Sequence, residues 1–204
     1  MAANTLLQSL IDDTITLTKR PDLLGETKLA VKSATLKVHT TDYMQKDLKD
    51  HSIQFNTEEY FQEFEPKLLI PTWRALKYIR KVVLDSSSGN YIGANFLSIV
   101  TPESILDDYS VEKPDVAYGA GTVIKLKLST KERRFLVGCY VYPTLVDESY
   151  ESWIAREFPY AIIYDAAATV FKGIGFDEQA AQFRSDAALW FTIVKNSNVL
   201  VTGE

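Results

Sequence analysis

The sequence contains few of the residues that most often carry chemistry. Its 204 residues include one cysteine, Cys139, and two histidines, His39 and His51. A single cysteine excludes an intrachain disulfide and a cysteine-based zinc site. Because Cys139 lies within the apolar run 135–141, we interpret it as a small buried side chain in a strand and not as a nucleophile.

Long hydrophobic runs and an excess of positive charge are also missing. The richest apolar stretch, 158–174, is interrupted by Asp165 and Lys172, so we expect no transmembrane helix. The N-terminus lacks the basic and apolar regions of a signal peptide, which favours a reducing, cytoplasm-like compartment for synthesis. With 22 Lys and Arg against 27 Asp and Glu, the net charge is −5. This balance argues against a general nucleic-acid binder or a polybasic membrane binder.

Helical periodicity dominates both ends of the chain. The pattern predicts a first helix from residue 6 that ends before Pro21, and a second over 25–38 with an apolar face at Leu29, Ala30, Ala34, Leu36 and Val38. Near the C-terminus, Pro159 and Gly173 predict the start and end of one helix, and Asp177 caps another. The expected helical domain is 1–50 with 147–196, and 197–204 is expected to be an extended tail.

The middle of the chain, 51–146, has the short alternating runs of a β-rich insertion. Residues 123–128 and 135–141 are predicted strands, and the polar stretch Ser129 to Arg134 between them is predicted as a hairpin turn. Further strands are expected at 52–55, 73–84 and 95–100, with a loop at 85–90 and a short helix from Thr101. The predicted fold class is α+β: a helical bundle formed by N- and C-terminal helix pairs and interrupted by an antiparallel β-sheet.

Candidate catalytic residues are scarce, and we assign no catalytic, cofactor-binding or metal-binding residue. His39 and His51 lie near Asp42, Asp47 and Asp50, the residue types of a two-histidine, one-carboxylate metal site. Their spacing matches no compact ligand motif, so a solvated connection is the favoured interpretation and a metal-dependent hydrolase the alternative. Neither a Gly-x-Ser-x-Gly elbow nor a phosphate-binding P-loop is present in the sequence.

A basic cluster suggests a second alternative. Its members are Lys125, Lys127, Lys131, Arg133 and Arg134. On a hairpin they could contact an acidic partner or nucleic-acid phosphates, which would make the chain a soluble binding module. The favoured interpretation is the solvated side of an amphipathic hairpin.

The C-terminal helical region resembles the C-terminal helix pair of bacteriophage head–tail connector (adaptor, or neck) proteins. The resemblance lies in the run from Trp153 to Ala168, the turn at Gly173 and Gly175, and the helix over 179–194. The N-terminal helix pair and the boundary from His39 to Leu48 also fit this family. The resemblance covers about the first 50 and last 50 residues.

This resemblance implies a structural virion protein and not an enzyme. In that family identical copies, commonly twelve, form a ring beneath the portal protein, extend the DNA channel and offer a platform for tail or nozzle proteins. DNA passes through the lumen without sequence-specific binding, and no cofactor or membrane is involved. The protein would be made in the host cytoplasm and reside at the head–tail interface of the virion. By the same resemblance an extended C-terminal segment would contact the portal, here Asn196, Ser197, Asn198, Val199 and Leu200.

Overall fold

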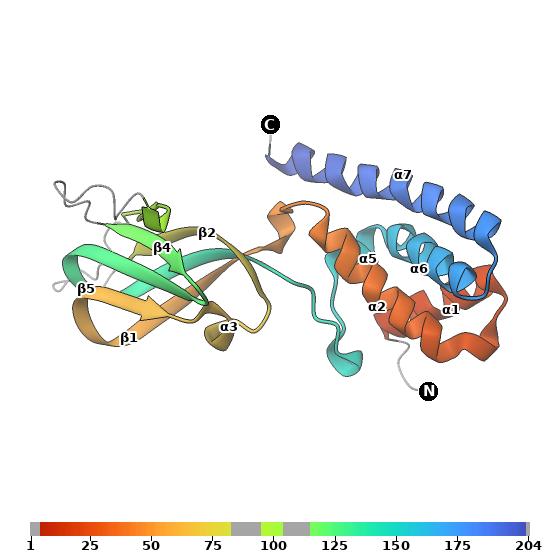
Figure 1. The fold of residues 1–204 in the computed structure, drawn as a ribbon, viewed down its shortest axis with the longest axis horizontal. Helices are drawn as coiled ribbons and strands as arrows, with labels where there is room; N and C mark the ends of the chain where they lie inside the picture. The colour runs from red at the N-terminus through yellow and green to blue at the C-terminus, as the bar shows by residue number, and fades with distance from the viewer. Residues whose placement is uncertain (1–4, 83–94, 104–114, 203–204) are drawn as a thin grey trace. The chain divides into compact units, whose positions relative to one another are not determined.

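The computed structural model describes residues 5–82, 95–103 and 115–202 (Figure 1). The chain divides into two compact units. The helical unit comprises Met1–Asp47 and Tyr142–Glu204, and the sheet unit comprises Leu48–Val141. Within the described residues there are six α-helices and a five-stranded mixed sheet, with helices towards both termini.

The first two helices begin and end where local chemistry dictates. Helix α1 (Leu6–Thr18) starts at Thr5, whose side chain accepts a hydrogen bond from the Gln8 amide, and ends at Lys19 in the left-handed conformation. A short turn through Pro21 leads into α2 (Leu24–Thr40). These two helices correspond to the predicted N-terminal helices.

Helix α6 (Pro159–Gly173) is the central element of the helical unit. It contacts α1, α2, α5 (Trp153–Glu157) and α7 (Asp177–Thr202). Its buried side chains are mostly alanine and isoleucine, which allows neighbouring helices to approach closely. Figure 1 shows α6 between α7 on one side and α1 and α2 on the other. The predicted boundaries of α6 and the predicted start of α7 are confirmed.

Two long strands form the frame of the sheet unit. β1 (Leu48–Phe64) and β5 (Val123–Val141) pair antiparallel from Leu48 opposite Tyr140 to Phe64 opposite Ile124. The C-terminal half of β5 also pairs with β2 (Trp73–Lys81), and its N-terminal half pairs with β4 (Val116–Ala120). The register of β1 against β5 is irregular between Gln54 and Phe61, where the ribbon bends and β5 changes its second partner.

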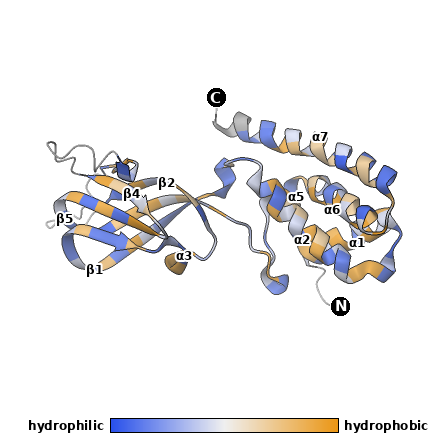
Figure 2. Cartoon of the chain, viewed as in Figure 1, coloured by the Kyte–Doolittle hydropathy of each residue, from blue (hydrophilic) through white to orange (hydrophobic). Residues whose placement is uncertain are grey.

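One hydrophobic core lies between the two halves of this bent ribbon. The Phe55 ring centroid lies 5.6 Å from that of Phe135 and 6.3 Å from that of Phe64, so residues from both halves meet. Isoleucine, leucine and valine side chains of β2 and β5 belong to the same core, together with Ala117 of β4. Figure 2 shows the corresponding alternation along the strands as successive orange and blue bands.

A polar cluster holds the bend of β5. Lys81, at the end of β2, is 4 % exposed, and its Nζ lies 2.8 Å from Oδ1 of Asp115, just before β4. The backbone amide and hydroxyl of Ser129 both donate to the same carboxylate. Burial opposes ionisation of Asp115, but the hydrogen bonds from Lys81 and Ser129 outweigh it and lower the pKa of that carboxyl. Three strands are therefore joined at one charged group.

The predicted fold class, a bundle of two helix pairs interrupted by an antiparallel sheet, is wrong. The sheet is mixed, because β3 (Ser98–Ile99) runs parallel to β4. The helices do not form two pairs, since α5 is a further helix that breaks from α6 at Phe158. A residue before proline is pushed out of the helical conformation, and Phe158 precedes Pro159. A two-residue strand is too short for its sequence to show its direction.

The predicted hairpin is also wrong. Ser129 to Arg134 lie inside β5, so 123–128 and 135–141 are two halves of one strand and do not pair with each other. The observed hairpin joins β4 to β5 at Gly121, which has the positive φ of 64° that such turns need. Polar residues occur at 129–134 because β5 bends there at the surface, and a bend and a turn have similar composition.

The predicted extended tail is wrong as well, because α7 continues as a helix to Thr202. The strands expected at 73–84 and 95–100 coincide with β2 and β3 where these are described. The loop expected at 85–90 lies outside the described residues. Of the short helix expected from Thr101, only the first residues are described.

Gly138 offers a test of the packing between β2 and β5. A Cβ atom at Gly138 would clash with Cζ of Tyr78, whose hydroxyl is anchored by donating to Asp50. Gly138→Ala should therefore lower the free energy of unfolding by about 1–3 kcal/mol, as overpacking does. Urea unfolding followed by circular dichroism measures this change.

The matched control is Gly119→Ala in β4, where nothing lies within 4 Å of the added Cβ. Its effect should stay within about 0.5 kcal/mol. Equal destabilisation by the two substitutions would contradict the packing of Tyr78 over Gly138.

Candidate functional site

One exposed apolar stripe lies on α2. Leu29 is 70 % exposed and Leu36 is also exposed, two turns further along the same side. With Gly25 and Ser33 they form an uncharged row that we call the α2 stripe. Both leucines are predicted to lie on the buried face, and this prediction is wrong: the buried side of α2 carries Thr27, Ala30, Val31, Ala34, Thr35, Val38 and His39.

A second exposed stripe lies on α7. Leu189 is 64 % exposed, and Ile193 is exposed one turn later. Uncharged side chains continue the row in both directions, and we call the set the α7 stripe: Gln182, Ser185, Leu189, Ile193 and Asn196. The opposite side of α7 buries Ala180, Ala187 and Val194 at seven-residue spacing.

The two stripes are separate surfaces of the helical unit. Both helices contact α6, and each stripe lies on the side of its helix away from its buried residues. The exposed side of a surface helix normally carries charged residues. Exposed apolar residues that gather on one surface can mark a region that associates with another protein. We therefore take the α2 stripe and the α7 stripe as the candidate functional site.

The predicted basic cluster is spread along β5 and faces acidic and aromatic side chains of β1. Lys125 Nζ lies 3.8 Å from an oxygen of Glu63, and Arg133 Nε lies 3.5 Å from an oxygen of Glu58. Lys131 Nζ lies 5.5 Å from the centre of the Tyr60 ring. Lys127 and Arg134 are opposite Phe61 and Gln54 in the strand register. Because 129–134 lie inside β5, these residues are not gathered at a hairpin tip, and the binding module for acidic partners stays a prediction.

The residues predicted to contact a portal lie in the last turns of α7. The Asn198 side-chain oxygen accepts a hydrogen bond from the Gln45 amide at 2.7 Å, and the Ser197 hydroxyl donates to the Val194 carbonyl. Asn196 belongs to the α7 stripe. Val199 and Leu200 are helical, but their side chains lie outside the described residues. The segment thus packs within the helical unit, and its contact with a portal stays a prediction.

His39 lies in a buried hydrogen-bond network that no local sequence pattern predicts. Its Nδ1 is 2.9 Å from Oδ1 of Asp47, and its Nε2 is 2.9 Å from Oγ of Ser152. Asp47 also accepts a hydrogen bond from Nε1 of Trp153 at 2.8 Å. His39 and Ser152 are each 2 % exposed and Asp47 is 4 % exposed. The network joins the end of α2, the turn Gln45–Asp47 and the start of α5.

The order serine, histidine, aspartate is also that of a hydrolase triad. Here the serine already has a structural task, because Ser152 caps α5 by accepting a hydrogen bond from the Ala155 amide. All three side chains are shielded from solvent, so a substrate carbonyl could not reach the Ser152 oxygen. We therefore interpret the network as a structural connection. The sequence signal for this cap is the hydroxyl of Ser152, which lies three residues before Ala155 at the start of a helix.

The histidines do not form the metal site considered as an alternative. Both ring nitrogens of His39 are occupied by hydrogen bonds, and His51 lies on β1 in the sheet unit. Within the described ranges, no group of three or more His, Cys, Asp or Glu side chains is placed to hold a metal ion. Cys139 is buried, and burial, with a smaller contribution from Asp50, raises the pKa of its thiol to about 11. Its interpretation as a buried strand residue is confirmed.

Comparison with known proteins assigns no family: no family model matches the chain, and no curated protein matches it significantly in sequence. None of the helices in the described part of the chain has the length and apolar character needed to cross a membrane.

The buried network gives a stability test. Asp47→Ala would leave the His39 and Trp153 N–H groups without their shared acceptor, which should cost about 2–4 kcal/mol of unfolding free energy. Chemical denaturation measures this loss. The control Asp13→Ala changes an exposed carboxylate on α1 and should stay within about 0.5 kcal/mol. Equal effects would contradict the role assigned to Asp47.

Proposed function

We propose that this chain is a structural virion protein of the phage head–tail connector type, which assembles as a ring beneath the portal protein. The observation that carries this proposal is the pair of uncharged, leucine-bearing stripes on α2 and α7. The sequence resemblance in 153–194 supports the same class independently. The role requires contact with copies of the chain, with a portal and with tail proteins, and it requires no catalysis.

Two different surfaces are what a ring needs. In a ring, each subunit offers one surface to the copy before it and another to the copy after it. A two-fold dimer would need only one self-complementary surface. The α2 and α7 stripes flank the rigid α6 core, so contact between the α2 stripe of one copy and the α7 stripe of the next repeats with a fixed rotation. Twelve copies are the number that the resemblance implies.

The net charge fits a conduit for DNA. With a charge of −5 per subunit, a ring of copies would repel phosphates and allow DNA to slide through its lumen. A ring that gripped DNA would need a positive inner surface. We therefore expect the assembled protein to bind duplex DNA weakly at physiological salt.

Charge substitutions on the stripes test the ring. Leu29→Glu and Leu189→Glu should each weaken the subunit contact by about 100-fold or more, because each buries an unpaired carboxylate in an apolar contact. Mass photometry, with and without purified portal protein, should show the ring for the original chain and small species for both variants. A strictly monomeric original chain that never binds portal would contradict the proposal.

A mixture of the two variants makes the test specific for head-to-tail contact. Leu29→Glu keeps the α7 stripe and Leu189→Glu keeps the α2 stripe, so together they should form a 1:1 dimer that cannot grow. The matched control is Leu24→Glu, a leucine that is 51 % exposed on α2 but lies outside the stripe. It should leave the ring intact.

A further inference from the structure

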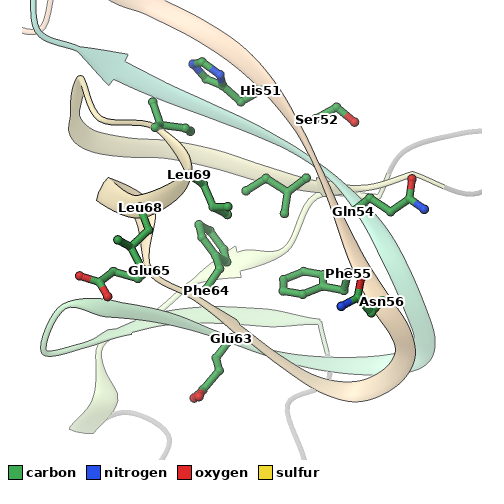
Figure 3. Close-up of a pocket in the computed structure, with 12 residues that line it drawn as sticks. His51, Ser52, Gln54, Phe55, Asn56, Glu63, Phe64, Glu65, Leu68 and Leu69 are labelled. Carbon is green, nitrogen blue, oxygen red and sulfur yellow. The ribbon is translucent and has the colours of Figure 1, made fainter.

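The sheet unit contains a pocket of about 460 Å³ on the concave side of the β1 bend (Figure 3). Its walls come from both arms of β1, His51–Asn56 and Glu63–Phe64, and from Glu65 and α3 (Pro66–Leu69) beyond them. Figure 3 shows Phe55, Phe64 and Leu69 around its interior, with Ser52 and Gln54 turned outward. The pocket is thus an opening into the core beside the edge of the sheet.

The strand beside this opening has a free edge. β1 stands at the end of the strand order and pairs only with β5 among the described strands. Proteins usually protect such edges with charged residues, proline or very short strands. The segment Ser52–Asn56 reads Ser-Ile-Gln-Phe-Asn, with neither charge nor proline, and belongs to a strand of 17 residues. It is therefore suited to pairing with another strand.

The chemistry of the walls defines what such a strand would carry. Inside, Phe55 and Phe64 offer aromatic surface, and Leu69 lies at the mouth with 53 % of its surface exposed. At the rim, Glu63 and Glu65 supply negative charge, and none of the lining residues is Lys or Arg. Alternate side chains of a strand point to opposite sides. An apolar side chain would enter the pocket while its neighbours, if basic, would meet the rim carboxylates.

The paired edge of β1 already shows this pattern. There β5 places Ile124 opposite Phe64 and Lys125 opposite Glu63, with 3.8 Å between the ammonium and carboxylate groups. In the second half of the run from Val123 to Leu128, apolar and basic residues alternate. Next to Glu63 and Phe64, β1 thus accepts a strand in which apolar and basic residues alternate.

We propose that the free edge of β1 at Ser52–Asn56 binds an extended segment of a partner protein in which apolar and basic residues alternate. The segment adds one antiparallel or parallel strand to the sheet beside β1, and one apolar side chain fills the pocket between Phe55, Phe64 and Leu69. This inference goes beyond the ring proposal and does not depend on it, because the stripes belong to the helical unit and the free edge to the sheet unit.

A peptide with the sequence of residues 123–128, acetylated and amidated, is the probe. Binding to the full-length chain is measured by fluorescence anisotropy, and hydrogen exchange reports which amides become protected. We expect saturable binding with new protection within 52–56 and no loss of protection in β5. A loss in β5 would show strand displacement and would overturn the proposal.

Substitutions at the pocket separate specific binding from general attraction. Leu69→Asp should weaken binding about tenfold or more, because it replaces an apolar contact with a charge. The control Ile99→Asp changes an exposed apolar residue of β3 outside the pocket and should leave binding unchanged. Glu65→Lys should weaken binding of the basic peptide. It should strengthen binding of a peptide that has glutamate in place of lysine. Both pocket residues are partly exposed, so the variants should fold.

Three results would overturn the proposal. One is that a peptide with the same composition but adjacent lysines binds as tightly as the alternating peptide, since charge alone would then explain the binding. Another is an absence of binding at about 1 mM peptide, because the affinity would then be too weak for a recognition site. The third is protection of 52–56 that rises with protein concentration without peptide, which would assign the edge to a second copy of the chain. Using the Leu29→Glu variant as the host keeps the outcome separate from ring formation.

Discussion

The shared bend of β1 and β5 determines the architecture of the sheet unit. Because both strands bend at the same level, β5 pairs with β2 along one half and with β4 along the other, and one core forms between the halves. The partly buried contact of Lys81 with Asp115 fixes this bend, since the same carboxylate binds Ser129 of β5. The bend also leaves the other edge of β1 open, so the proposed binding edge follows from the same constraint.

In the helical unit, α6 has the corresponding central position. Four of its buried residues are alanines, which helps four helices to pack around it, and exposed leucines lie on the outer sides of α2 and α7. The network of His39, Asp47 and Ser152 then fixes the ends of α2 and α5 to the turn that leads into β1. A rigid core with two free flanks is a suitable building block for a closed ring.

Local signals in the sequence predicted the helices well, and long-range features poorly. Pro159, Gly173 and Asp177 mark helix ends through their own backbone preferences, so α6 and the start of α7 could be located. Periodicity shows that α2 is amphipathic, but it does not show which side neighbours will cover, so Leu29 and Leu36 were assigned to the wrong face. The polar run Ser129 to Arg134 has the composition of a turn, and only the pairing of β1 along all of β5 shows that it is a bend. The buried network joins residues more than 100 positions apart, beyond the reach of any local pattern.

The pairing of Leu48 with Tyr140 places the entry and exit of the sheet unit on neighbouring strands. Paired residues of antiparallel strands have Cα atoms only about 5 Å apart. To the helical unit, nearly one hundred inserted residues are therefore equivalent to a short loop between Asp47 and Tyr142. Evolution could enlarge, shrink or exchange the insertion without disturbing the helices, and an engineer could replace it with a brief glycine-containing linker. Related chains would then be expected to share their helices while differing in the module that these two positions carry.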